Sequence, residues 1–140
     1  IGWCDWSSDV CSSDLSTKFD PKYAEYASSG RCYNLAYNMA KETGLTYVEG
    51  LLMVKGKDNV VCAIGHAWCA TGDGMMLKVL DPAMASFQHR RELMYVGVPL
   101  HLSYVEKMAS LYGNIGVLDG NPNGPIDGVY VDNPEEWLVL

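Results

Sequence analysis

Hydrophobic residues recur at helical spacing in one segment of the N-terminal half of the chain. Residues 31–43 place their apolar side chains on one face of a helix, namely Leu35, Ala36, Met39 and Ala40. Gly44 follows as a left-handed C-cap. A shorter helix is predicted to begin at Pro21, with Asp20 as its N-cap, because proline loses no hydrogen bond at the first helical position.

After Gly44 the pattern becomes that of β-strands. Apolar and β-branched residues dominate three segments, at 45–54, 60–71 and 75–80. Further along, we expect a strand at 93–96, a helix to about residue 111, a loop over 113–128, an edge strand at 129–131 and a helix start at 132–136. Ser103-Tyr104-Val105-Glu106 is a capping-box pattern that would open the helix.

The connection between the second and third predicted strands contains Asp73-Gly74. Asp-Gly is the strong signature of a two-residue hairpin loop. With these two residues as the loop, His66 lies directly across from Asp81. Directly opposed residues of an antiparallel pair share a face, with Cβ atoms about 4.5–5.5 Å apart. The sequence therefore predicts contact between an imidazole and a carboxylate.

Composition indicates one acidic domain. The 140 residues carry 10 Lys and Arg against 17 Asp and Glu, a net charge of −7. This balance argues against non-specific nucleic-acid binding, which needs clustered basic residues. The chain has no apolar run of membrane-spanning length, so we expect no membrane partner. A chain of this size buries one core, and nothing in it predicts an oligomeric state.

The first fifteen residues are set apart from the fold. Residues 5–15 resemble a translated sequencing-library adaptor, which nothing has selected to fold. We therefore expect residues 1–15 to be a non-native segment of a metagenomic or draft sequence. Residues 16–140 are expected to form a single domain, and the N-terminus of this domain could be truncated. The cysteines of this part are Cys32, Cys62 and Cys69, an odd number that favours reduced thiols and a cytoplasmic setting.

Three residues in chain order could form a thiol site. Cys32 lies in the first turn of the predicted helix, where the helix N-terminus and a neighbouring imidazolium would favour the reactive thiolate. His66 would take and return a proton, and Asp81 would orient the ring. Gly30 would let the backbone approach a substrate carbonyl, and the N–H of Cys32 could contribute to an oxyanion hole. None of these roles requires a cofactor or a metal.

These residues resemble a known family. Gly30-Arg31-Cys32, Tyr47-Val48-Glu49-Gly50, His66-Ala67-Trp68 and Leu80-Asp81-Pro82 are similar to the transglutaminase-like branch of the papain-like cysteine-enzyme superfamily. The resemblance implies an α+β fold in which a nucleophile-bearing helix packs on an antiparallel sheet. It also implies acyl transfer through a thioester on an amide or isopeptide bond, with a protein or peptide as substrate.

The resemblance also assigns roles to residues. Cys32, His66 and Asp81 would form the catalytic triad of a hydrolase, a cysteine peptidase, a deamidase or a transglutaminase. Trp68 would shield or line the site, although a buried core tryptophan fits the position equally well. Tyr47 and Glu49, like Gly30, would lie at or near the site.

Other interpretations remain open. Cys62, His66 and Cys69 have a superficial zinc spacing, but alternation along a strand points Cys69 away from the other two. The chain could also be a catalytically inactive member that keeps the fold as a binding module. An acyltransferase that uses a small-molecule thioester would need a longer chain for its acceptor cleft.

Overall fold

Helices and an antiparallel sheet make up the computed structural model, which describes residues 19–28, 31–55, 58–72, 78–85, 92–113 and 115–117. The described elements are, in chain order, a 3₁₀ helix η1 (Pro21–Tyr26), α1 (Cys32–Thr43), β1 (Thr46–Lys55), β2 (Val61–Thr71), β3 (Lys78–Leu80), β4 (Glu92–Leu100) and α2 (Leu102–Tyr112). The fold is therefore α+β, as the sequence predicts. Residues 1–18, Gly30, Asp73-Gly74, 129–131 and 132–136, and most of 113–128 lie outside the described residues.

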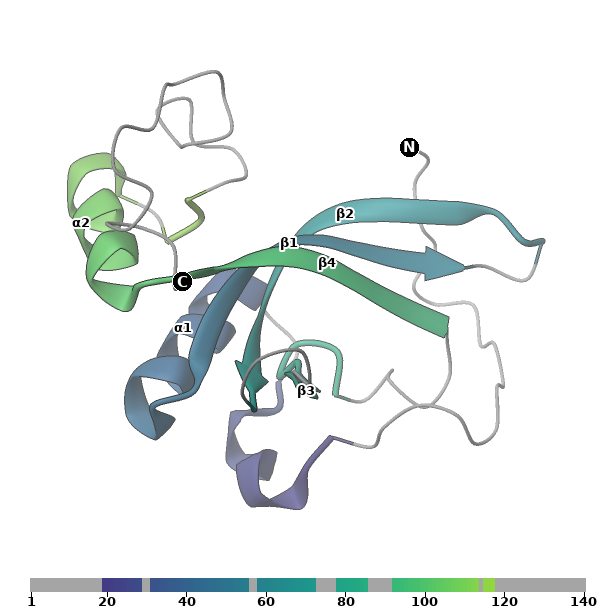
Figure 1. Cartoon of the computed structure of the whole chain (residues 1–140), viewed down its shortest axis with the longest axis horizontal. Coiled ribbons are helices and arrows are strands. Elements are labelled where there is room, and N and C mark those ends of the chain that lie inside the picture. Colours follow the sequence, from purple (N-terminus) through teal and green to yellow (C-terminus); the bar gives the residue numbers. More distant parts are fainter. Residues whose placement is uncertain are drawn as a thin grey trace.

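The four strands form one sheet in the order β3-β2-β1-β4, and every neighbouring pair is antiparallel (Figure 1). β4 is longer than the predicted strand at 93–96 and contains Gly97 and Pro99. Both residue types ordinarily end strands. Proline is tolerated here because β4 pairs only with β1 among the described strands, so one of its edges needs no backbone donor.

The predicted register between β2 and β3 is wrong. Thr71 pairs with Lys78 and Cys69 with Leu80, whereas a loop made of Asp73-Gly74 would pair Thr71 with Met76. The predicted loop residues themselves lie outside the described residues. The register is displaced by two residues from the predicted one. Because side chains alternate with a period of two, the displacement leaves His66 and the residue after β3, Asp81, on the same face.

The helix predictions hold in part. α1 begins at Cys32 and ends at Gly44, whose φ of 75° is left-handed as a C-cap requires. Asp20 caps η1 by accepting a hydrogen bond from the Lys22 N–H at 3.0 Å. The predicted capping box of α2 is wrong, because α2 starts one residue before Ser103 and its N-cap, His101, makes no side-chain capping bond.

The core lies between α1 and one face of the sheet. α1 packs on β2 and β1, and α2 packs on α1 (Figure 1). The main buried cluster includes Met39, Tyr47, Cys69, Leu80 and Leu100. These sheet residues share one face by register, and we call this the helix face. His66 and Trp68 project from the opposite face, which we call the open face because the helix-packed cluster lies on the other side. Several of its residues, including Leu52 and Val54, are nevertheless buried.

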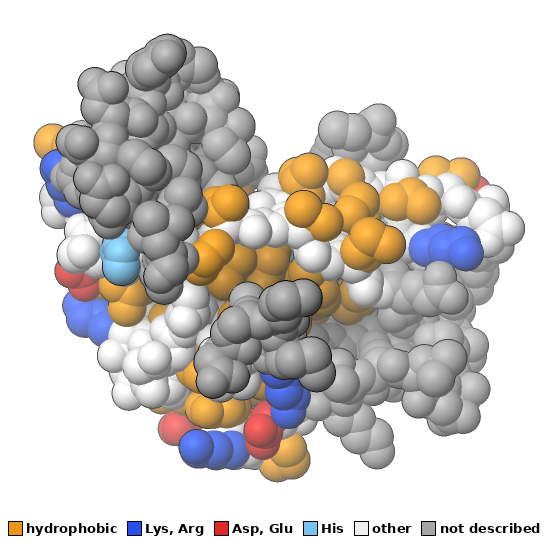
Figure 2. Space-filling model, in the orientation of Figure 1, with side chains coloured by type: hydrophobic (Ala, Val, Ile, Leu, Met, Phe, Trp, Pro, Cys, Tyr) orange, Lys and Arg blue, Asp and Glu red, His pale blue; other side chains and the backbone are white. Residues whose placement is uncertain are grey.

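The strands extend beyond the helices, and hydrophobic side chains gather over the sheet on the surface that Figure 2 shows. The exposed apolar residues on these strands include Leu51, Val61, Met94 and Val96. In the part of the chain that the structure describes, no helix is long and apolar enough to cross a membrane.

Candidate active site

The centre of the site is a buried pair of side chains. His66 comes from the middle of β2, and Asp81 directly follows β3. The Nε2 of His66 donates a hydrogen bond to Oδ2 of Asp81 at 2.7 Å. The residues are 4% and 0% exposed. A buried carboxylate must be paired or hydrogen-bonded, so this contact fixes the orientation of the imidazole.

Both oxygens of the Asp81 carboxylate accept hydrogen bonds. Oδ1 accepts from the backbone N–H groups of Ala83 and Met84, each at 3.1 Å. Oδ2 accepts from the Tyr95 hydroxyl at 2.9 Å in addition to His66. Four donors therefore surround one buried carboxylate. Sequence patterns assign no role to Tyr95, and no local motif identifies it, because it reaches Asp81 from β4.

Cys32 is the first residue of α1 and is partly exposed. Cys32 interacts with His66, because hydrogen bonding with its thiol and the charge of that group are among the influences that raise the pKa of His66. Since Nε2 of the ring is bonded to Asp81, Nδ1 is the ring nitrogen that remains for the thiol. β3 pairs only with residues 69–71 of β2. His66 therefore lies past the end of β3, on a stretch of β2 that β3 does not cover.

The electrostatics of His66 reflect these partners. Burial opposes protonation and is the strongest single influence on the ring. The hydrogen bonds to Asp81 and Cys32, together with the charges of both groups, outweigh burial and raise the pKa of His66 to about 9. At neutral pH the ring is therefore an imidazolium between a thiol group and a carboxylate.

Trp68 lies beside His66 on the open face. The two rings are stacked, with centroids 6.3 Å apart and planes inclined by 22°. The indole also makes an edge-type contact with the Tyr95 ring, with centroids 5.1 Å apart. Gly97 on β4 makes room for the indole, because a Cβ there would lie 2.6 Å from Cη2 of Trp68. Trp68 is thus a buried residue that also covers the imidazole.

Tyr47 and Glu49 lie on the helix face, away from Trp68. Gly50, the residue after Glu49, pairs with His66 in the register of β1 and β2. Glu49 is 0% exposed and accepts hydrogen bonds from the Tyr47 hydroxyl at 2.8 Å and from the Val117 N–H at 2.9 Å. Glu49 thus ties the segment after α2 to the sheet. Burial, followed by the charge of Glu49, raises the pKa of Tyr47, with a smaller influence from Cys32.

The other cysteines differ from Cys32. Cys69 is buried on the helix face and donates a hydrogen bond to the Ala36 carbonyl at 3.2 Å. Burial, and secondarily the charge of Asp81, raises the pKa of Cys69 to about 12. Cys62 is disulfide-bonded, so the expectation of reduced thiols holds for Cys32 and Cys69 and is wrong for Cys62. The zinc set of Cys62, His66 and Cys69 is therefore not assembled.

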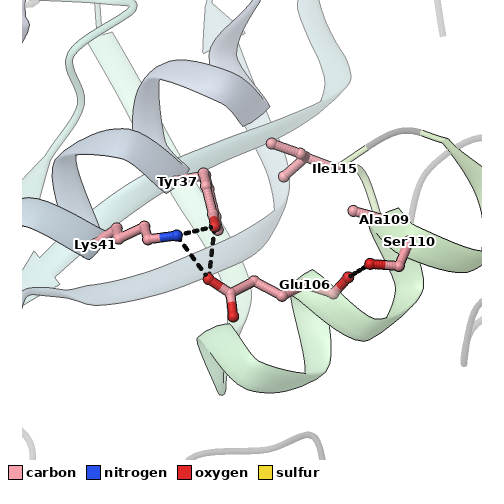
Figure 3. A pocket seen from close by; sticks show the side chains of 6 residues that line it. All are labelled: Tyr37, Lys41, Glu106, Ala109, Ser110 and Ile115. Atoms are coloured by element: carbon pink, nitrogen blue, oxygen red, sulfur yellow. Dashed lines mark hydrogen bonds and ion pairs between the residues drawn. The ribbon is translucent and has the colours of Figure 1, made fainter.

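A second polar cluster lies between α1 and α2 (Figure 3). Glu106 accepts a hydrogen bond from the Tyr37 hydroxyl at 2.6 Å. It also forms an ion pair with Lys41 at 3.1 Å. These residues line a hollow of about 500 Å³ together with Ala109, Ser110 and Ile115. The charges in this exposed cluster are already paired with each other, so the cluster by itself indicates no ligand.

Comparisons of the chain with protein-family models, with curated proteins and with solved structures find no match. The chemistry of the site is therefore argued from its own geometry. The imidazolium of His66 is hydrogen-bonded to the buried Asp81 carboxylate and is influenced by the Cys32 thiol at the N-terminus of α1. This set of groups can generate a nucleophile and move a proton.

Proposed function

We propose that the protein is a cysteine-dependent acyl-transfer enzyme that acts on an amide or isopeptide bond of a protein or peptide. The observation that carries the proposal is the position of His66, which is hydrogen-bonded to Asp81 at 2.7 Å and whose pKa is raised by both Asp81 and Cys32. Nucleophile, base and orienting group in this order define a triad.

In the proposed reaction, the Cys32 thiolate attacks the carbonyl carbon of the amide. The C–N bond breaks as the imidazolium of His66 gives its proton to the leaving nitrogen, and a thioester remains. Water or an amine then attacks the thioester carbon and gives a proton to His66. The C–S bond breaks, and the thiolate and the imidazolium are regenerated.

Each residue type suits its step. A pKa of about 9 keeps His66 protonated at neutral pH, so a proton is ready for the leaving group. Asp81 stabilises the imidazolium and holds its orientation. The first N–H groups of α1 lack intrahelical partners, and the N–H of Cys32 is the proposed oxyanion donor. Trp68 limits the access of water to the imidazole.

We also propose that the fold is a transglutaminase-like, papain-like core. In support, the nucleophile-bearing helix α1 packs on an antiparallel sheet, and that sheet carries the histidine and precedes the aspartate. The order of Cys32, His66 and Asp81 along the chain agrees with this assignment.

Alkylation by iodoacetamide tests the proposed function. At pH 7 we expect Cys32 to be modified rapidly and Cys69 to remain unmodified, because Cys69 is buried and its thiol pKa is about 12. His66→Ala should slow the labelling of Cys32 about 100-fold, the lower end of what a positioned proton-transfer group contributes. Peptide mass spectrometry identifies the labelled residue.

The buried Cys69 is the internal control of this experiment. Cys32→Ser should remove the rapid labelling at position 32, and the peptides that contain Cys4 and Cys11 are followed separately. Equal labelling rates for Cys32 in the native protein and in His66→Ala would contradict the enzyme and favour a binding module that retains the fold.

A further inference from the structure

We infer that Tyr95 is a positioning residue of the site, which holds Asp81 in place for His66. The inference rests on the proposed function and adds a residue from β4 to the three in the triad. Tyr95 donates a hydrogen bond to Oδ2 of Asp81 at 2.9 Å, and this is the oxygen that His66 binds at 2.7 Å.

The hydroxyl completes the coordination of a buried carboxylate. Oδ1 of Asp81 is held by the N–H groups of Ala83 and Met84, which belong to the turn after β3. Those bonds fix one oxygen, but they leave Oδ2 with His66 alone unless Tyr95 contributes. Hydrogen bonds to a carboxylate spread its charge. Tyr95 therefore governs both where Oδ2 lies and how strongly it attracts the imidazolium.

Tyr95 is itself held in a defined place. It pairs with Leu52 of β1 in the sheet register, so β1 lies between it and the strand that carries His66. Its ring meets Trp68 edge-on, at 5.1 Å and 63°. Since Trp68 also stacks on His66, the indole contacts both residues that bind Oδ2 of Asp81.

Glycines make this arrangement possible. Gly50 and Gly97 are paired across β1 and β4. A Cβ at Gly97 would lie 2.6 Å from the indole of Trp68, and a Cβ at Gly50 would meet the backbone of residues 96 and 97. The absence of a side chain at Gly97 makes room for the Trp68 indole, and its absence at Gly50 allows the close approach of the β4 backbone. On the open face, Tyr95 of β4 therefore reaches the carboxylate of Asp81.

Tyr95→Phe tests the inference because it removes only the hydroxyl and keeps the ring against Trp68. With one donor fewer on Oδ2, the carboxylate attracts the imidazolium more strongly, and the pKa of His66 should rise by about half a unit. The measurement is an NMR titration of isotope-labelled histidine, with His66 assigned from a His66→Gln spectrum. When the rate of Cys32 alkylation by iodoacetamide is measured against pH, its inflection at high pH should shift upward by the same amount.

Tyr37→Phe is the matched control, because it also removes a tyrosine hydroxyl bonded to a carboxylate, but on the α1–α2 surface. It should leave the His66 titration unchanged. An unchanged midpoint in Tyr95→Phe would overturn the inference, whereas a lowered midpoint would support it, because it would show that Oδ2 has moved away from the imidazolium. If the NMR midpoint rises as expected while Cys32 alkylation does not depend on His66, Tyr95 still positions Asp81 and it is the proposed enzyme that fails.

Discussion

The structure contains two clusters of similar composition in very different surroundings. One combines Tyr95, Asp81 and His66 on the open face of the sheet. The other combines Tyr37, Glu106 and Lys41 on the surface between α1 and α2 (Figure 3). In each, a tyrosine hydroxyl and a cationic group meet at one carboxylate oxygen.

The clusters differ in burial. Asp81 is 0% exposed, whereas the side chains of Lys41 and Glu106 are 58% and 46% exposed. Water solvates the surface charges whether or not they are paired, so an exposed ion pair contributes little. A buried charge is not solvated by water, so its stability depends on its hydrogen-bonding and charged partners. The comparison shows that burial, rather than residue type, gives the Asp81 cluster its strong interactions.

The largest expected effect comes from Asp81→Asn. The substitution keeps the size of the side chain but removes the counter-ion of the His66 imidazolium. Breaking a buried pair in this way should lower the free energy of unfolding by about 3 kcal/mol at pH 7. Urea denaturation measures the loss. Burial of His66 is then opposed by Cys32 alone, so the pKa of His66 should fall well below about 9.

Glu106→Gln is the matched substitution in the exposed cluster. It also replaces a carboxylate by its amide next to a tyrosine and a cation. We expect no change in the urea midpoint. Equal losses for Asp81→Asn and Glu106→Gln would refute the role given to burial.

The second effect is the dependence of stability on pH. The pKa of His66 is raised in the folded protein from 6.5 to about 9. The stabilisation is therefore fully present below pH 6.5 and is lost as the pH rises through 9. A rise of this size corresponds to roughly 3 kcal/mol. Urea denaturation between pH 6 and pH 10 should show the decrease.

His66→Gln isolates the contribution of the imidazole. In this variant the decrease between pH 6.5 and 9 should disappear, because the side chain does not titrate. The exposed cluster does not interfere, since the pKa of Lys41 is raised further above 10.5 by its bonds to Tyr37 and Glu106. The same decrease in the native protein and in His66→Gln would show that another group is responsible.

The sequence predicts the parts of the fold that depend on local periodicity. The apolar spacing in α1 and the glycine after it are sufficient to place that helix. The contact between His66 and Asp81 is present although the predicted register is wrong by two residues. A two-residue displacement keeps both side chains on one face and leaves them diagonal neighbours, which long side chains can bridge.

The remaining features depend on contacts between distant segments. Tyr95 reaches Asp81 only because β4 pairs with β1 on the side away from β2, and no local pattern specifies that order. Glu106 illustrates the same limit. Its spacing from Ser103 is that of a capping box, but in the structure it bonds to Tyr37 and Lys41 of α1. Tertiary partners thus override a local signal.

The smallest expected effect is that of Lys41→Met. Lys41 bonds to Tyr37 at 3.0 Å and to Glu106 at 3.1 Å, and it lies over the Tyr37 ring at 5.4 Å. Despite these contacts, we expect the urea midpoint of Lys41→Met at neutral pH to equal that of the native protein, because salt and water screen exposed charges. The measurement is repeated in low salt and in about 1 M NaCl, where the Debye length falls to about 3 Å. A clear loss of stability that vanishes in high salt would show that the surface pair contributes after all, and the contrast with Asp81 would then be one of degree.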